Sequence, residues 1–164
     1  MPDATPAEVV AALRARDWVL TTAESCTAGL ISGAVTDIAG SSAVFDRGFV
    51  TYSNSAKAQM LGIAPQLIDA HGAVSEQVAR EMATGALAHS EAEIAVSVTG
   101  IAGPGGSDYK PEGRVCFGLA ICDGQTHVET VEFGALGRTQ VRARTVSHAL
   151  ELVRRVCDSG LPIK

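Results

Sequence analysis

Residues 22–29, Thr-Ala-Glu-Ser-Cys-Thr-Ala-Gly, place a serine where an apolar run gives way to a helical pattern. At a strand-to-helix junction the Ser25 hydroxyl could act as a nucleophile, with N–H groups of the first helical turn facing a developing negative charge. The alternative is structural, because Ser and Thr are preferred N-cap residues and either Ser25 or Thr27 would satisfy the first-turn N–H groups. Spacing alone leaves both interpretations open.

A serine hydroxyl needs a base before it attacks an amide, and the most plausible base in this chain is Lys57. None of the four histidines has a position that favours a Ser-His-Asp triad. Lys57 follows an extended segment and lies between two alanines, but a lysine acts as a base only when burial or a neighbouring positive charge lowers its pKa. Tyr52 could relay the proton or orient the amine. The alternative is a solvated lysine and a tyrosine at a strand end.

Cys26, next to Ser25, is a rival nucleophile because a thiol is intrinsically the better attacker. A thiol amidase would require a partner for this cysteine. Beyond Glu24 the sequence offers no histidine or glutamate-lysine arrangement that matches one.

A second candidate segment, residues 99–107, is rich in glycine, and glycine lets backbone N–H groups approach an anion closely. We expect Gly100 and Gly103 to bind an anionic part of the substrate. The segment matches neither a Walker A motif nor a G-x-G-x-x-G fingerprint, and the alternative is a mobile surface loop.

Three arginines lie close together at the start of the last helical pattern: Arg138, Arg142 and Arg144. One of them could bind a phosphate or carboxylate bidentately, although such arginines usually belong to a solvated helix face.

The elements that must position these residues alternate between helical and extended patterns. Helices are expected over residues 6–17, 27–38, 54–61, 75–89 and 138–157, strands over 18–22, 45–52, 94–98, 115–122 and 126–133, and a turn around Pro65. Early alternation and a late hairpin predict an α/β fold: a three-layer α/β/α sandwich with a mixed, mostly parallel sheet. Ligands bind beyond the carboxyl ends of parallel strands in such sheets, which selects residues 24–27 and 99–113.

Length and charge narrow the class of protein. The 164 residues predict a single domain over residues 1–164. A net charge of −5 and the absence of a long basic run argue against nucleic acid or an anionic membrane as the partner. Without a signal-peptide pattern or an apolar run of roughly 20 residues, we expect a cytoplasmic protein. The four scattered cysteines and the lack of a carboxylate cluster predict no metal site and no cofactor.

Four segments together resemble the CinA carboxy-terminal domain family, the nicotinamide-nucleotide amidases. They are TTAESCTAG at 21–29, TDIAGSSAVFDRGFVTYSNSAKAQMLG at 36–62, HGAVSEQVAREMATGAL at 71–87 and VSVTGIAGPGG at 96–106. The resemblance covers residues 7–157 and implies hydrolysis of nicotinamide mononucleotide to nicotinic acid mononucleotide and ammonia. It also implies a homo-oligomer. Because the family includes members linked to competence and DNA damage, a non-catalytic nucleotide-binding module is the alternative.

The resemblance also assigns roles to individual residues. It implies Ser25 as the nucleophile assisted by Lys57 and Tyr52, and it places Thr99 and Arg138 at further functional positions. We expect Thr27 to contribute to substrate binding through the backbone near Ser25. The family often has Gly-Asp-Arg where this chain has Leu-Gly-Arg at 136–138, so the partner of Arg138 stays open and Arg142 is a second candidate.

Overall fold

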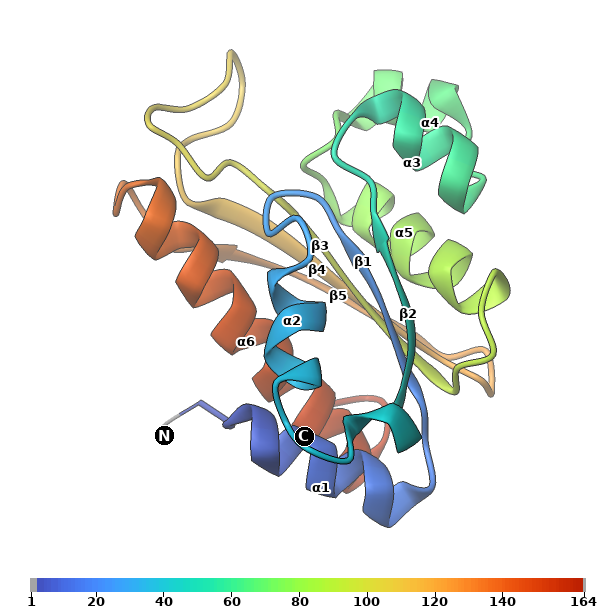
Figure 1. The fold of residues 1–164 in the computed structure, drawn as a ribbon. Helices are drawn as coiled ribbons and strands as arrows, with labels where there is room; N and C mark the ends of the chain where they lie inside the picture. The colour runs from blue at the N-terminus through green and yellow to red at the C-terminus, as the bar shows by residue number, and fades with distance from the viewer. Residues whose placement is uncertain (1–2, 164) are drawn as a thin grey trace.

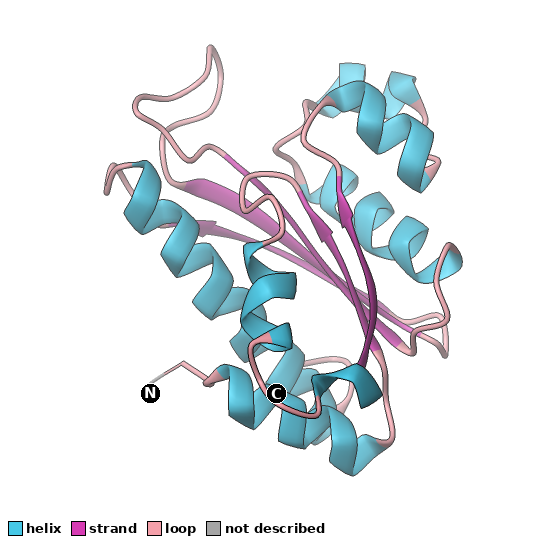
Figure 2. Ribbon diagram, viewed as in Figure 1, coloured by secondary structure: helices cyan, strands magenta, loops and turns pink. Residues whose placement is uncertain are grey.

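A five-stranded mixed sheet forms the middle layer of the protein, whose computed structural model describes residues 3–163 (Figures 1 and 2). The strand order is β2-β1-β3-β4-β5. The first three strands run parallel to one another, and the last two form an antiparallel hairpin that extends the sheet beyond β3. The strands are β1 (Leu20–Glu24), β2 (Phe45–Val50), β3 (Ile94–Gly100), β4 (Arg114–Ile121) and β5 (Thr126–Glu132).

Helices cover both faces of this sheet, as Figure 2 shows. One face carries α1 (Pro6–Arg16), α2 (Leu30–Thr36) and α6 (Arg138–Ser159), and the other carries α3 (Asn54–Leu61), α4 (Pro65–His71) and α5 (Glu76–Ala88). A 3-10 turn, Ser41–Ala43, leads from α2 into β2. The predicted three-layer α/β/α sandwich with a mixed sheet and a late hairpin is therefore confirmed.

Each face of the sheet packs against its helices through a separate apolar cluster. The larger cluster joins α1, α2 and α6 to β1, β3 and β4 around Phe117, Leu13 and Leu152, all fully buried. Smaller side chains, including Ala95 and Ala120, meet α5 on the opposite face. Burial on both faces explains why residues 94–98 of β3 are apolar except for Ser97, whose buried hydroxyl donates to the carbonyl oxygen of Ala79. No helix of the described chain combines the length and apolar character that crossing a bilayer requires.

The start of α2 differs from the sequence prediction. The helix begins at Leu30, not at residue 27, and residues 26–29 form a turn in which Ala28 and Gly29 have φ values of 47° and 99°. The reason is that the carboxylate of Glu24 accepts the N–H groups of Ile31 and Ser32. A strand residue thus caps the helix from across the turn, and Ser25 does not lie in the first turn of the helix.

Two other elements also differ from the prediction. The first strand begins at Leu20, because Trp18 lies outside the sheet with the Arg16 guanidinium 4.1 Å from its ring centroid. Pro65, expected in a turn, opens α4 instead, which is consistent with the preference of proline for the first helical position.

Candidate functional site

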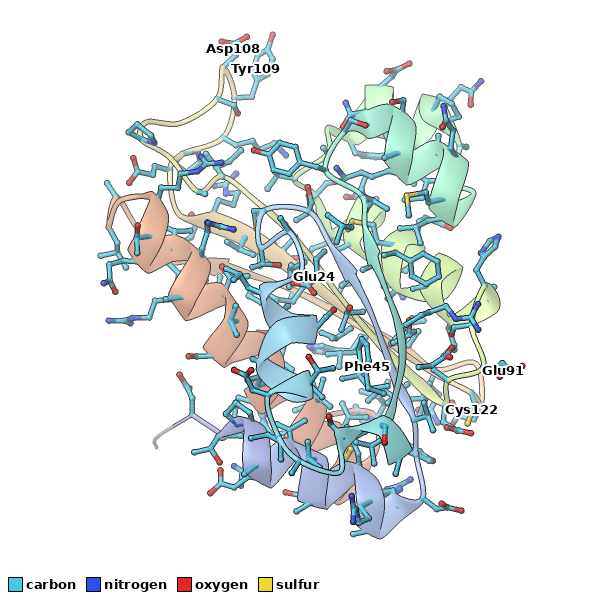
Figure 3. All side chains as sticks on the ribbon, in the orientation of Figure 1. Glu24, Phe45, Glu91, Asp108, Tyr109 and Cys122 are labelled. Atoms are coloured by element: carbon cyan, nitrogen blue, oxygen red, sulfur yellow. The ribbon has the colours of Figure 1, made fainter. Side chains whose placement is uncertain are left out.

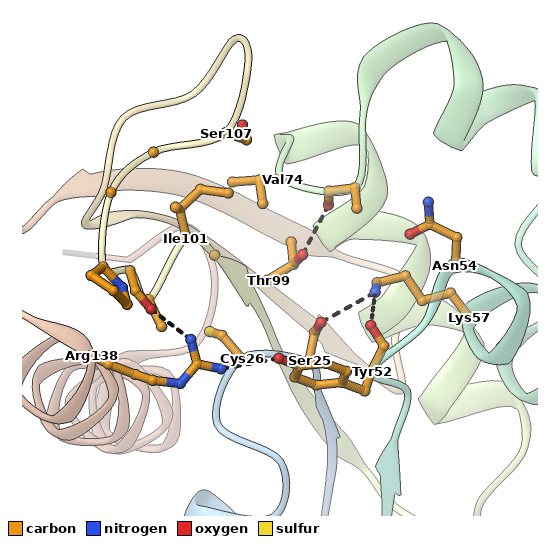
Figure 4. Close-up of a pocket in the computed structure, with 17 residues that line it drawn as sticks. Ser25, Cys26, Tyr52, Asn54, Lys57, Val74, Thr99, Ile101, Ser107 and Arg138 are labelled. Carbon is orange, nitrogen blue, oxygen red and sulfur yellow. Dashed lines mark hydrogen bonds between the residues drawn. The ribbon is translucent and has the colours of Figure 1, made fainter.

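The carboxyl ends of the three parallel strands meet at one edge of the sheet and bring the expected functional residues together. Ser25 follows β1, Tyr52 follows β2, and Thr99 lies near the end of β3. The Ser25 N–H donates to the carbonyl oxygen of Val98 at 3.1 Å, which ties the serine to β3. All three predicted residues line a cavity of about 350 Å³ (Figure 4). This edge is the expected ligand position in a parallel sheet.

Ser25 and Lys57 are in direct contact inside this cavity. The Nζ of Lys57 lies 3.1 Å from the Oγ of Ser25, and no other described residue hydrogen-bonds to that hydroxyl. The same Nζ lies 3.2 Å from the carbonyl oxygen of Tyr52. Lys57 is carried by α3, whose first turn is fixed because the Ser53 hydroxyl accepts the N–H of Ala56. The Ser25–Lys57 pair has the geometry of a nucleophile and its base.

The environment of Lys57 favours its neutral form. The side chain is only 1% exposed, and no carboxylate of the described residues forms a salt bridge with it. Burial lowers the pKa of the Lys57 amine below its ordinary value, because desolvation penalises the charged form. A neutral amine can accept the proton of the serine hydroxyl.

Cys26 is poorly suited to be the nucleophile. Its side chain is 6% exposed, and burial, together with the negative charge of Glu24, raises the pKa of its thiol to about 11. Arg142 and Lys57 oppose this shift only in part. The group is therefore a protonated thiol at neutral pH, whereas thiol catalysis requires the thiolate.

The fully buried carboxylate of Glu24 organises the turn that carries Ser25. One oxygen accepts from the Thr27 hydroxyl at 2.6 Å and from the N–H of Ile31 at 2.8 Å. The other accepts from the N–H and hydroxyl of Ser32, at 3.0 and 2.8 Å, and from the hydroxyl of Thr22 at 3.4 Å. The sequence suggested Glu24 only as a partner for Cys26, yet an acid inside a buried strand already signals a dense set of hydrogen-bond donors.

Thr27 is placed differently from the other expected binding residues. It is fully buried, its hydroxyl is directed at Glu24, and its side chain does not line the cavity. Its backbone N–H, like that of Cys26, donates to no other described residue. Arg142 holds the opposite side of this turn, since its Nε donates to the Cys26 carbonyl oxygen at 3.0 Å. In a planar trans peptide the N–H of Thr27 therefore points away from Arg142.

The glycine-rich segment forms a long loop, residues 101–113, which connects the carboxyl end of β3 to β4. It projects from the body of the protein with Tyr109, 90% exposed, at its tip (Figures 1 and 3). Gly100 and Gly103, which were expected to bind an anionic part of the substrate, both line the cavity. The N–H groups of Ala102, Gly103 and Gly106 donate to no described residue, which leaves them available to an anion.

Arg138 and Tyr52 meet at the rim of the cavity. The Nη1 of Arg138 donates to the carbonyl oxygen of Gly103 at 2.6 Å, and its Nη2 donates to the Tyr52 hydroxyl at 3.0 Å (Figure 4). No described carboxylate pairs with this guanidinium, so its charge is available for a ligand. Arg142, the second candidate, is turned toward the Ser25 turn and does not line the cavity.

Tyr52 hydrogen-bonds to Lys57 through its main-chain carbonyl and not through its phenol. The Tyr52 carbonyl oxygen accepts a hydrogen bond from the amine, while the phenol hydroxyl accepts one from Arg138.

Thr99 lines the cavity too, although its hydroxyl donates to the carbonyl oxygen of Ala73 at 2.9 Å. Asn54, for which the sequence suggested no role, also lines the cavity, and its side-chain amide hydrogen-bonds to no described residue. Within residues 3–163 no three histidine, cysteine or acidic side chains are grouped as metal ligands.

Comparison with known proteins identifies the family. The sequence profile of the CinA C-terminal domain matches residues 3–157. The chain is similar to the nicotinamide-nucleotide amidohydrolase PncC of Enterobacter agglomerans, 52% identical over 149 residues and 90% of each chain. It is also 51% identical to PncC of Escherichia coli K12 over 145 residues, 88% of this chain and 87% of that one.

A solved structure shares the fold. The competence/damage inducible protein CihA from Agrobacterium tumefaciens superposes with a TM-score of 0.83 at 47% identity, covering 92% of this chain and 96% of that one. The matching profile spans the strands and loops that build the cavity. The chain belongs to the CinA C-terminal domain family.

Proposed function

We propose that this protein is an amidohydrolase that converts nicotinamide mononucleotide and water to nicotinic acid mononucleotide and ammonia. The observation that carries the proposal is the 3.1 Å contact between the Ser25 hydroxyl and the buried Lys57 amine inside a cavity. The names of the two relatives, nicotinamide-nucleotide amidohydrolases at 51–52% identity, supply the substrate.

In the first step neutral Lys57 accepts the Ser25 proton while Oγ attacks the carboxamide carbon. The N–H groups of Cys26 and Thr27, which donate to no other described residue, stabilise the oxyanion. The Tyr52 carbonyl orients the lysine and accepts a hydrogen bond from its ammonium form. Lys57 then returns the proton to the leaving nitrogen, and ammonia departs as the acyl-serine ester forms.

In the second step water attacks the ester. Lys57 removes a proton from the water, the tetrahedral intermediate collapses, and Ser25 leaves with that proton as nicotinic acid mononucleotide is released. One amine thus acts as base and acid in each half of the reaction.

The glycine loop and Arg138 bind the phosphate of the nucleotide. The N–H groups of Ala102, Gly103 and Gly106 supply neutral donors, and the Arg138 guanidinium supplies charge. Thr99 and Gly100 form the cavity wall between this loop and Ser25. Binding energy from the remote phosphate then positions the carboxamide for attack.

The sharpest test compares two adjacent side chains. Ser25→Ala should abolish ammonia release while nicotinamide mononucleotide still binds in calorimetry. Cys26→Ala keeps the backbone N–H and should retain activity within about tenfold of the wild type. Full activity in Ser25→Ala would contradict the proposal, and loss in Cys26→Ala alone would favour the thiol. Tight binding without ammonia release by the wild type would favour a non-catalytic nucleotide-binding module.

We further propose that the enzyme works in the cytoplasm as a homo-oligomer, with a small nucleotide as its ligand. Its four cysteines are free thiols, consistent with a reducing compartment. Light scattering of the purified protein tests the assembly state.

A further inference from the structure

Glu112 belongs to the glycine loop, two residues before the start of β4, and the proposed reaction gives it no role. Its Oε1 accepts the N–H of Gly105 at 2.5 Å, and its Oε2 accepts the N–H of Gly137 at 2.9 Å. One carboxylate therefore joins two backbone segments that are separate in the sequence.

Both of these hydrogen bonds are close to the contact between Arg138 and Gly103. Gly137 immediately precedes Arg138, the first residue of α6. Gly103, whose carbonyl oxygen accepts from Arg138, has a φ of 90° and packs directly on the Glu112 side chain. A Cβ at position 103 would lie 2.6 Å from the Cδ of Glu112. Glu112 therefore contacts Gly103, the acceptor at the rim, and the backbone N–H of Gly137, the residue that precedes Arg138.

The carboxylate also brings a negative charge to the start of α6, where it accepts the N–H of Gly137. Gly137 is the N-cap of α6 and has no side chain to accept the helix's free N–H groups. An acid at this end interacts favourably with the helix dipole, so the negative charge of Glu112 stabilises the position from which Arg138 projects.

We propose that Glu112 is a positioning residue that fixes Arg138 and the glycine loop relative to each other, so that guanidinium and loop N–H groups converge on one anionic group of the substrate. This inference rests on the proposed function, in which that group is the nucleotide phosphate. Glu112 acts through Arg138 and Gly105 and does not touch the substrate. Its loss therefore weakens binding of the anion while the Ser25–Lys57 pair remains intact.

The opposite hypothesis is that the Glu112 carboxylate occupies the anion position and repels the substrate. In that case its removal would strengthen binding. Asp108 provides a matched control, because it is an exposed acid of the same loop and its side chain hydrogen-bonds to no described residue. Asp108→Ala removes the same charge without removing either link.

The experiment measures ammonia release from nicotinamide mononucleotide by the wild type, Glu112→Ala, Glu112→Gln and Asp108→Ala. Glu112→Ala should raise KM about tenfold and leave kcat within about twofold of the wild type. This pattern is expected because the phosphate is bound equally well in the ground state and in the transition state. Glu112→Gln keeps one acceptor oxygen and should fall between the wild type and Glu112→Ala. Asp108→Ala should match the wild type. Thermal unfolding of each variant separates positioning from a general loss of structure.

An unchanged or lower KM in Glu112→Ala would overturn the inference. A parallel loss of kcat and thermal stability would also overturn it, in favour of a purely structural role. Failure of the wild type to release ammonia would instead reject the proposed function. Glu112 could then still be tested by calorimetry with inorganic phosphate, for which Glu112→Ala should again bind about tenfold more weakly than Asp108→Ala.

Discussion

The amine of Lys57 lies 3.1 Å from the hydroxyl of Ser25, although 32 residues separate them in the chain. Strand β1 delivers the serine and helix α3 delivers the lysine, so the contact depends on how the edge of the sheet packs against that helix. The lysine is buried there without a carboxylate partner among the described residues. Its amine is therefore suited to accept a proton, and the serine hydroxyl to give one up.

Activity should depend on the protonation of Lys57. Burial lowers the pKa of this amine, and only the neutral form accepts the Ser25 proton. The value of kcat/KM should therefore rise with pH through an apparent pKa below the ordinary lysine value of about 10.4. Initial rates of ammonia release across pH locate this limb. Lys57→Met should be inactive at every pH, and residual activity with the same pH dependence would assign the limb to another group.

Replacement of Tyr52 by Phe should affect binding more than chemistry. The phenol donates to or accepts from no group of the Ser25–Lys57 pair and lies 3.0 Å from Arg138, while Lys57 uses the main-chain carbonyl, which the variant keeps. One lost hydrogen bond of about 1 kcal/mol predicts a rise in KM of roughly fivefold. Steady-state kinetics should show kcat within about threefold of the wild type. A hundredfold fall in kcat would instead indicate that the phenol transfers a proton.

Removal of the Glu24 carboxylate should destabilise the fold strongly. Five donor groups converge on this fully buried side chain, and Glu24→Ala removes the acceptor that they share. We expect the free energy of unfolding to fall by about 3–5 kcal/mol, and by less in Glu24→Gln, which keeps one acceptor oxygen. Urea unfolding measures both. The exposed Glu91→Gln serves as the control and should change stability by less than about 0.5 kcal/mol.

Stability in acid should depend on Glu129. Its two carboxylate oxygens lie 2.7 Å from Nε2 of His148 and 2.8 Å from Nε2 of His127. The hydrogen bond from His148 is the main cause that lowers the pKa of Glu129 from 4.5 to about 2. The resulting stabilisation is fully present above 4.5 and is lost as the pH falls toward 2. Urea midpoints between pH 7 and pH 2 should fall less steeply for Glu129→Gln than for the wild type, whereas the exposed Glu81→Gln should follow the wild type.

Features with a local physical cause were predicted well from the sequence. The late hairpin predicted from residues 115–133 turns at Gly124, whose φ of 93° suits glycine, and the helix predicted to start at residue 75 is capped there by Ser75, which accepts the N–H of Val78. Both signals lie within a few residues of the structure that they determine. The mostly apolar residues 94–98 likewise predicted a buried strand, which is β3.

Features that depend on tertiary contacts were predicted less well. The start of α2 is set by Glu24 in the preceding strand, so local capping rules placed it too early. The burial of Lys57 and the direction of the Tyr52 phenol follow from packing between distant segments. Glu112 has no sequence signal at all, because its two partners are main-chain N–H groups.

The burial of Lys57 also has a thermodynamic consequence. Because its pKa is lower in the folded protein than in the unfolded chain, unfolding takes up a proton at this position when the pH lies between those two pKa values. The native state therefore gains stability as the pH rises through this range, in which the amine also becomes able to act as a base. An apolar side chain of similar size in place of Lys57 would make the fold more stable, but it would remove the base. Catalytic competence and robustness of the fold thus oppose each other at a single side chain.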